Sequence, residues 1–139
     1  PAFAFAAALA AALADTLGTE VGTLYGKRAY SPLTLRALPK GTPGGVSAAG
    51  TVAAFAGAAL MGFTGAALGL VEMPLLGATI TGGFLGAIIE SVATSLASLA
   101  GARLDHEFSN ALNTFVAAMT ALRLAALLAP RLGAAILGR

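Results

Sequence analysis

The stretch VSAAGTVAAFAGAALMGFTGAALGLV, at residues 46–71, decides the fold class of this chain. It holds no charged residue, and the nearest charges on either side are Lys40 and Glu72. A bilayer's hydrocarbon core is crossed by about 20 apolar helical residues, so this stretch is long enough to span it. We therefore expect residues 46–71 to form a transmembrane helix.

Further apolar stretches lie on both sides of it. One follows Pro74 and is interrupted only by Glu90, and another ends at Pro130 and holds a single charge, Arg123. The run at residues 1–14 is short and begins without Met, which indicates the remaining part of a helix from a longer protein. The sequence predicts an all-α, polytopic transmembrane bundle in a single domain, with helices at about residues 1–22, 46–71, 75–100 and 108–129 and a loop at 23–45.

The composition supports a membrane protein and excludes several other classes. Of the 139 residues, 58% are hydrophobic and only 10% are charged, against about 25% charged in soluble domains. The absence of Cys excludes disulfides, thiolate nucleophiles and sulfur-based zinc sites. Eight Lys and Arg against six Asp and Glu are too few cations for a nucleic-acid surface. The expected surroundings are therefore membrane lipids.

Small residues recur at a spacing of four within these stretches. In lipid, such pairs let helix backbones approach closely, so we expect a compact bundle. The oligomeric state stays open, a homo-oligomer included. The pairs are Gly50 with Ala54, Gly65 with Gly69, and Gly82 with Gly86.

The cations indicate how the bundle is oriented. Lys and Arg are enriched in short cytoplasmic loops of membrane proteins. This places the loop at 23–45 in the cytoplasm of a bacterial or archaeal cell, although two tail cations disagree. The supporting residues are Lys27, Arg28, Arg36, Lys40 and Arg103, and the opposing ones are Arg131 and Arg139.

The polar residues of the helices are expected to meet at this same face. Asp15 and Glu20 lie near the end of the first helix, and Glu90 lies past the middle of the third. Asn110 and Asn113 lie near the start of the fourth helix. Alternating helix directions bring all of these positions to one side. Ionisable residues inside a membrane are costly, so each is a candidate functional residue.

Carboxylates beside hydroxyl and amide groups suit Mg²⁺, which commonly takes one or two carboxylates together with waters and phosphate oxygens. The segment KGTPGGVS, at residues 40–47, is a glycine-rich loop that leads into the second helix. Backbone N–H groups at a helix start favour phosphate, although a simple turn is the alternative interpretation. His106 is interpreted as a solvated loop residue.

Four motifs in this order carry a family resemblance: ADTLGTEVG at 14–22, KGTPGGVS at 40–47, GGFLGAIIES at 82–91, and Asn110 with Asn113. The chain resembles the transmembrane protein 19 family, also called domain of unknown function 92, which includes phytyl phosphate kinase. The resemblance implies a membrane enzyme that transfers a phosphoryl group from a nucleotide, CTP, to an isoprenoid lipid phosphate with Mg²⁺. Further helices upstream are common in that family.

The resemblance also implies roles for individual residues. Asp15 and Glu20 become metal ligands, and Glu90, where the family commonly has Asp, contacts the metal directly or through another group. These three carboxylates form the predicted catalytic set. Asn110 and Asn113 would orient the nucleotide or phosphate. The implied phosphate cradle consists of Lys40, Gly41, Thr42, Gly44, Gly45 and Ser47.

Two other functions remain open at this stage. A transporter or assembly protein would use Asp15, Glu20 and Glu90 along an ion path, and Gly82-Gly83 would mark a break in the third helix. A lipid cytidylyltransferase would share CTP and the metal but would release pyrophosphate.

Overall fold

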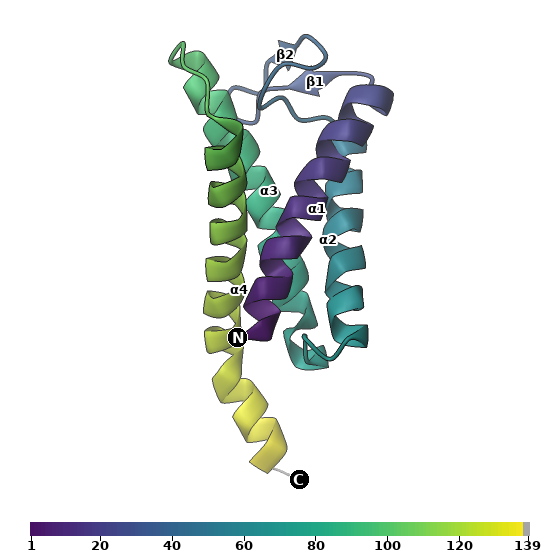
Figure 1. Cartoon of the computed structure of the whole chain (residues 1–139), viewed down its shortest axis with the longest axis vertical. Helices are drawn as coiled ribbons and strands as arrows, with labels where there is room; N and C mark the ends of the chain where they lie inside the picture. The colour runs from purple at the N-terminus through teal and green to yellow at the C-terminus, as the bar shows by residue number, and fades with distance from the viewer. Residues whose placement is uncertain (138–139) are drawn as a thin grey trace.

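The computed structural model describes the backbone of residues 1–137 and the side chains of residues 1–130. Within this part, four long helices form one bundle (Figure 1). Each of the four is long and apolar enough to cross a membrane, which confirms the predicted polytopic helical fold. The helices are α1 (Ala2–Tyr25), α2 (Ala48–Ala67), α3 (Leu76–Leu99) and α4 (His106–Leu137), and the 3₁₀ turn η1 (Met73–Leu75) precedes α3.

Three helix boundaries, two in α2 and one in α4, differ from the prediction for identifiable reasons. Helix α2 begins only after Ser47, whose side chain accepts a hydrogen bond from the Gly50 N–H at 3.1 Å. It ends at Ala67, because Gly69 with φ +72° turns the chain toward η1. The prediction that Pro130 ends the fourth helix is wrong, since α4 continues through it. Proline is tolerated in membrane helices when neighbouring groups satisfy the freed carbonyl.

The loop between α1 and α2 contains a small antiparallel ribbon that the all-helical prediction omitted. Strand β1 (Ala29–Tyr30) pairs with β2 (Ala37–Leu38), and Tyr30 also bridges to Val46. A buried hydrogen bond of 3.1 Å between the Ser31 and Ser95 hydroxyls anchors this ribbon to α3. Strands of two residues show no alternation of polar and apolar positions, so their sequence carried no signal.

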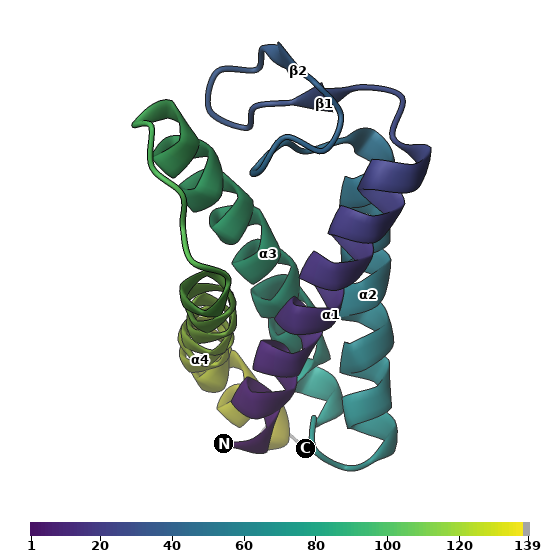
Figure 2. The same cartoon turned by 45° about the horizontal axis from the view of Figure 1, so that its top comes forward.

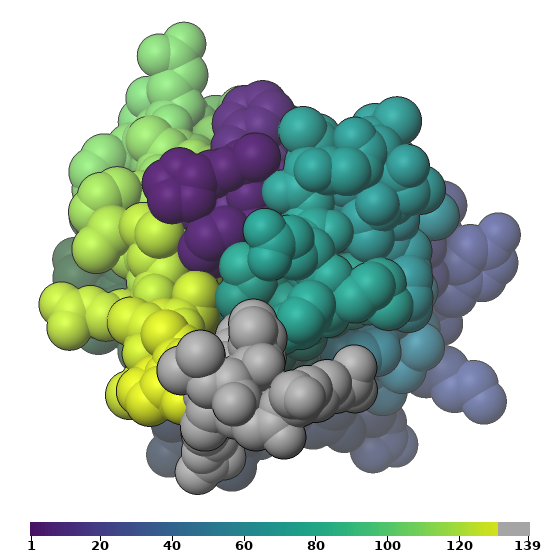
Figure 3. Space-filling model, turned by 90° about the horizontal axis from the view of Figure 1, so that it is seen from below, coloured from purple at the N-terminus to yellow at the C-terminus, as the bar shows by residue number. Residues whose placement is uncertain are grey.

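Helix α1 lies at the centre of the bundle and contacts the other three helices. Viewed from below in Figure 3, its first residues lie between α4 and the segment joining α2 to α3. Small residues make this close packing possible. A Cβ atom added at Gly83 would lie 2.6 Å from the Ala10 Cβ, and one added at Gly50 would lie 3.1 Å from the Gly22 Cα. The predicted pair of Gly65 and Gly69 does not form such a helix contact. Gly69 lies in the turn after α2, where an added Cβ atom would have no neighbour within 4 Å.

One end of the bundle carries the ribbon between α1 and α2 and the turn between α3 and α4. The end of α1, the start of α2, the end of α3 and the start of α4 lie at the same end of the bundle as the ribbon, and we call this the loop end (Figure 1). Toward the loop end α3 diverges from α1 and α2 (Figure 2). Deeper in the bundle the helices close onto an alanine-rich core of Ala10, Ala14, Ala54, Ala58 and Ala87.

Candidate functional site

A cavity of about 590 Å³ lies at the loop end, where α3 diverges from α1. Its wall combines α1, the glycine-rich loop, the start of α2, the second half of α3 and the start of α4. Every sequence-predicted site residue except Asn113 contributes to this wall. The predicted residues that line it are Asp15, Glu20, Lys40, Gly41, Thr42, Gly44, Gly45, Ser47, Glu90 and Asn110.

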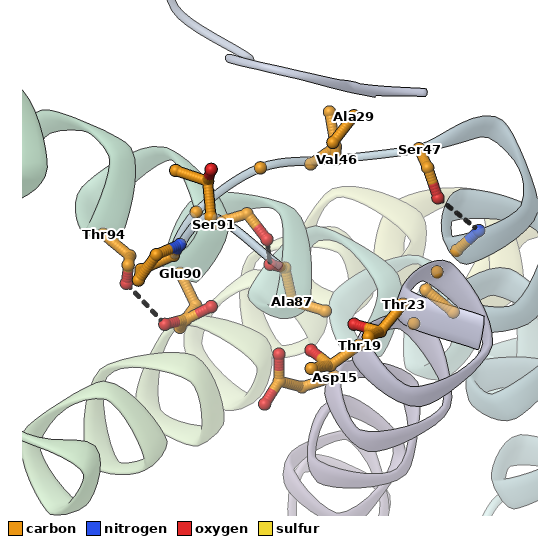
Figure 4. Close-up of a pocket in the computed structure, with 18 of the residues that line it drawn as sticks. Asp15, Thr19, Thr23, Ala29, Val46, Ser47, Ala87, Glu90, Ser91 and Thr94 are labelled. Atoms are coloured by element: carbon orange, nitrogen blue, oxygen red, sulfur yellow. Dashed lines mark hydrogen bonds between the residues drawn. The ribbon is translucent and has the colours of Figure 1, made fainter. Parts of the chain in front are cut away.

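Asp15 and Glu90 form an acidic pair across the cavity. Asp15 projects from α1 and Glu90 from α3, and both carboxylates point into the space between the two helices (Figure 4). The Thr94 hydroxyl donates a hydrogen bond of 2.7 Å to the Glu90 Oε1, which holds that carboxylate in place. Asp15 lies within electrostatic reach of both Glu90 and His106. The pair therefore forms a concentrated negative charge in a half-buried setting.

The glycine-rich loop packs against α3 through Gly44. Gly44 has φ +74°, and a Cβ atom there would lie 2.9 Å from the Ser91 carbonyl oxygen. Within the loop, the Gly45 N–H donates to the Thr42 carbonyl oxygen at 2.9 Å. Lys40 ties the loop to α1, because its Nζ donates to the Leu24 carbonyl oxygen at 3.3 Å. The loop is thus held from both sides and forms one rim of the cavity.

Ser47 has a structural task at this rim. Its hydroxyl oxygen accepts the Gly50 N–H at the start of α2. Gly22 of α1 packs close to the same hydroxyl, because a Cβ atom added at Gly22 would lie 3.1 Å from the Ser47 Oγ. Ser47 therefore stabilises the junction of α1 and α2. Its hydroxyl oxygen accepts the Gly50 N–H, so the hydroxyl group can still donate its proton in a hydrogen bond to a ligand.

The two asparagines of α4 separate in the structure. Asn110 is exposed and lines the cavity, next to His106, whose Nε2 lies 3.4 Å from the Asn110 Nδ2. Asn113 is buried, and its Nδ2 donates to the Ala11 carbonyl oxygen at 3.2 Å. This corrects the assignment of Asn113 to the site. Three residues along a helix leave the two side chains about 60° apart around the helix axis, which is enough to turn Asn113 toward α1.

Replacing each asparagine with alanine should separate these roles. The Asn113→Ala variant should lose about 1 kcal/mol of bundle stability, because interhelical hydrogen bonds in membranes contribute on this scale. The Asn110→Ala variant should keep its stability, because this side chain is exposed. Unfolding of both variants in mixed micelles by increasing SDS measures the difference. Equal stability of the two variants would contradict the packing role of Asn113.

The three predicted carboxylate ligands do not gather at one point. Within the described residues, no three His, Asp or Glu side chains lie close enough to hold a metal ion. The reason is helical geometry, since Asp15 and Glu20 lie five residues apart on α1 and point about 140° away from each other. Glu20 lies at the exposed edge of the cavity. Of the three predicted metal ligands, Asp15 and Glu90 therefore face each other across the cavity, and Glu20 lies apart from them at its edge.

Several cavity residues carried little signal in the sequence. His106, interpreted above as a solvated loop residue, is the first residue of α4 and lines the cavity. Thr94 and Ser109 also line it, and both are common residue types in any helix. The available signal was their spacing. Thr94 lies four residues after Glu90 and Ser109 lies three residues after His106, which places each pair on the same side of its helix.

Comparison with known proteins agrees with this architecture. Residues 1–102 match the family model described as "Integral membrane protein DUF92". An uncharacterized membrane protein of Synechocystis sp., sll0875, is similar to the chain, with 33% identity over 106 residues. The match covers 70% of this chain and 38% of the relative's length. No solved structure matches the chain. The chain belongs to the DUF92 family of integral membrane proteins.

Proposed function

We propose that this chain carries the phosphoryl-transfer site of a membrane-bound isoprenoid phosphate kinase of the phytyl type. The observation that carries the proposal is the cavity at the loop end. Its wall places the acidic pair Asp15 and Glu90 in the same space as Lys40 and the glycine-rich loop. Phosphoryl transfer depends mainly on positioning the phosphates and neutralising their charge, which such a constellation serves.

The acidic pair fits a phosphate-bound magnesium ion. Mg²⁺ usually keeps several waters and takes one or two carboxylates together with substrate phosphate oxygens. Asp15 and Glu90 supply two carboxylates, and Thr19 adds a hydroxyl one helical turn beyond Asp15. When bound, the ion neutralises charge on the nucleotide phosphates. In this proposal the ion arrives with its nucleotide, CTP.

The glycine-rich rim of this cavity suits phosphate groups. Lys40 carries a positive charge there, and Gly41 and Gly45 expose backbone that a ligand can approach closely. The start of α2 adds the partial positive charge of a helix N-terminus. His106 and Asn110 border the same space from α4 and offer further hydrogen-bonding groups.

The reaction that fits this site joins two phosphates. An oxygen of the lipid monophosphate forms a bond to the γ-phosphorus of the nucleotide. The bond between that phosphorus and the oxygen bridging to the β-phosphate breaks, and the nucleoside diphosphate leaves. The acceptor oxygen is already ionised, so the step needs no strong general base. Lys40 would hold the phosphates, and Asp15 and Glu90 would hold the magnesium ion that binds them, so that the reacting groups lie in line.

The location of the cavity supports a lipid acceptor and a cytoplasmic nucleotide. Its inner wall includes Ala54, Ala87 and Ile88, which can accommodate the first carbons of an isoprenoid chain. The cations of the two loops at this end favour the cytoplasmic side of a bacterial or archaeal membrane. The opposing tail cations Arg131 and Arg139 lie outside the residues whose side chains are described.

A transport function has less support from the same geometry. Helix α3 is continuous through Gly82 and Gly83, so the broken helix that a midplane ion site commonly uses is not formed there. The buried side chains of the bundle core are mostly alanine, and its fully buried larger polar side chains are Asn113 and Thr79. An ion path would need a continuous series of polar groups through this core.

A transfer assay on the full-length protein in detergent tests the proposal. γ-Labelled CTP or ATP is offered with phytyl, geranylgeranyl or farnesyl monophosphate and Mg²⁺, and label is expected in the lipid diphosphate. Lipid labelled from α-labelled CTP with release of pyrophosphate would identify a cytidylyltransferase. No transfer by folded protein with any pair would contradict both, and ion flux in proteoliposomes would be measured next.

A further inference from the structure

A second recess lies at the loop end, on the outer side of α1 and α2. It measures about 570 Å³ and shares no lining residue with the cavity described above. Two cations, two tyrosines and the first turn of α2 form its wall, with no carboxylate among them. The lining residues are Tyr25, Lys27, Arg28, Tyr30, Ala48 and Ala49.

The backbone holds this wall in place. Tyr30 exchanges two hydrogen bonds with Val46, at 2.8 and 2.9 Å, which fixes β1 beside the start of α2. Gly26 packs so closely that a Cβ atom there would lie 2.7 Å from the Ser47 Oγ. The segment carrying Lys27 and Arg28 is therefore fastened to the end of α1 and the start of α2. The two cations project from a defined surface.

Exposed apolar side chains of α1 and α2 lie next to the residues that line the recess. Val52 follows Ala48 by one helical turn on the same face of α2, and its side chain is 70% exposed. Leu24, in the last turn of α1, is also exposed. In a transmembrane bundle such apolar side chains contact lipid tails. A phospholipid whose tails lie along this face would bring its headgroup to the level of the recess.

The chemistry of the wall selects the charge of that headgroup. Basic residues next to membrane helices attract anionic lipids, and tyrosines favour the headgroup level of the bilayer. The start of α2 adds partial positive charge from its first-turn N–H groups. A zwitterionic headgroup would also bring a cation toward Lys27 and Arg28. We propose that this recess binds the headgroup of an anionic phospholipid, independently of the function proposed above.

Native mass spectrometry of the full chain with phosphatidylglycerol and phosphatidylcholine tests this proposal. The wild type is expected to retain phosphatidylglycerol in preference to phosphatidylcholine. A variant combining Lys27→Gln and Arg28→Gln should lose about tenfold or more of that preference, because each juxtamembrane cation contributes several-fold. A second variant, Tyr25→Ala, keeps the charge and should weaken the retention of both lipids while leaving the preference for phosphatidylglycerol, because tyrosine favours the headgroup level of any bilayer lipid.

The matched control combines Arg36→Gln with Arg103→Gln. These two exposed cations also lie in loops of the loop end but do not line the recess. The control should keep the lipid preference. An equal loss in the control, or no loss in the Lys27 and Arg28 variant, would overturn the proposal. Displacement of the lipid by inorganic phosphate would overturn the proposal and indicate a site for a soluble anion. A dimer that is present in the wild type and lost in the Lys27 and Arg28 variant would overturn it and indicate that a second copy of the chain occupies the recess.

Discussion

Replacing Asp15 with Asn is expected to lower phosphoryl transfer by on the order of a hundredfold, the scale of losing one charge-stabilising group in an active site. The change removes one negative charge and almost no volume. Asp15 is half-buried and faces the cavity, so its carboxylate interacts with whatever occupies that space. The transfer assay with labelled nucleotide measures the rate.

The Glu90→Gln variant should show a loss of the same order, because Glu90 is the other member of the acidic pair. Its Thr94 hydrogen bond can persist with the amide oxygen as acceptor, so the expected loss reflects charge. Both variants should also need more Mg²⁺ for half-maximal rate, which a purely structural role would not cause.

Glu72→Gln provides the matched control for both substitutions. Glu72 is exposed and lies just before η1, at the opposite end of the bundle from the cavity. The Glu72→Gln substitution removes the same charge from the chain, and this variant should keep the wild-type rate of phosphoryl transfer. Circular dichroism and the elution volume in detergent establish that each variant is folded. Full activity in both Asp15→Asn and Glu90→Gln would show that the site is elsewhere.

The Gly44→Ala variant is expected to lose about tenfold or more in phosphoryl transfer, as expected when a positioning element shifts by about 1 Å. A methyl group at Gly44 would meet the backbone of Ser91 and Ser95 on α3, so the loop must move outward. That movement would change the position of Lys40 relative to the acidic pair in the cavity wall. The same transfer assay measures the loss, with KM for the nucleotide expected to rise.

Gly41→Ala separates this clash from the cost of the backbone conformation. Gly41 also has a left-handed backbone, with φ +79°, but nothing lies within 4 Å of an added Cβ. Both alanines carry the conformational cost of about 1 kcal/mol, and Gly44→Ala alone displaces the loop from α3. Limited proteolysis at the loop should therefore accelerate in Gly44→Ala and much less in Gly41→Ala. Equal effects would show that docking on α3 does not position the loop.

The transmembrane helices were predictable because each depends on the length and apolar character of one continuous segment of the chain. The uncharged stretch before Glu72 is long enough to span a bilayer wherever it is placed, so α2 needed no partner to be recognised. The same reasoning failed at Pro130, because the tolerance of a proline inside a membrane helix depends on its neighbours. The ribbon at Ala29–Tyr30 was missed because it is held by pairing with Val46 and by Ser95, both distant in sequence.

The candidate site was predictable in its location and less so in its membership. Alternating helix directions bring Asp15, Glu90 and Asn110 to one end whatever the packing, and the structure has them around one cavity. Helix rotation then decides which side chains enter it. That rotation turns Asn113 into the contact with α1 and sets Glu20 at the edge.

The amino-acid order was sufficient for the membrane environment, the approximate spans and the end of the bundle where polar groups meet. These depend on the length of apolar runs and on the direction of successive helices, which are properties of each segment. The pairing of Asp15 with Glu90, the docking of Gly44 on α3 and the recess beside Lys27 arose only from the packed bundle. They depend on the rotation and separation of helices, which are set by contacts between residues far apart in the chain.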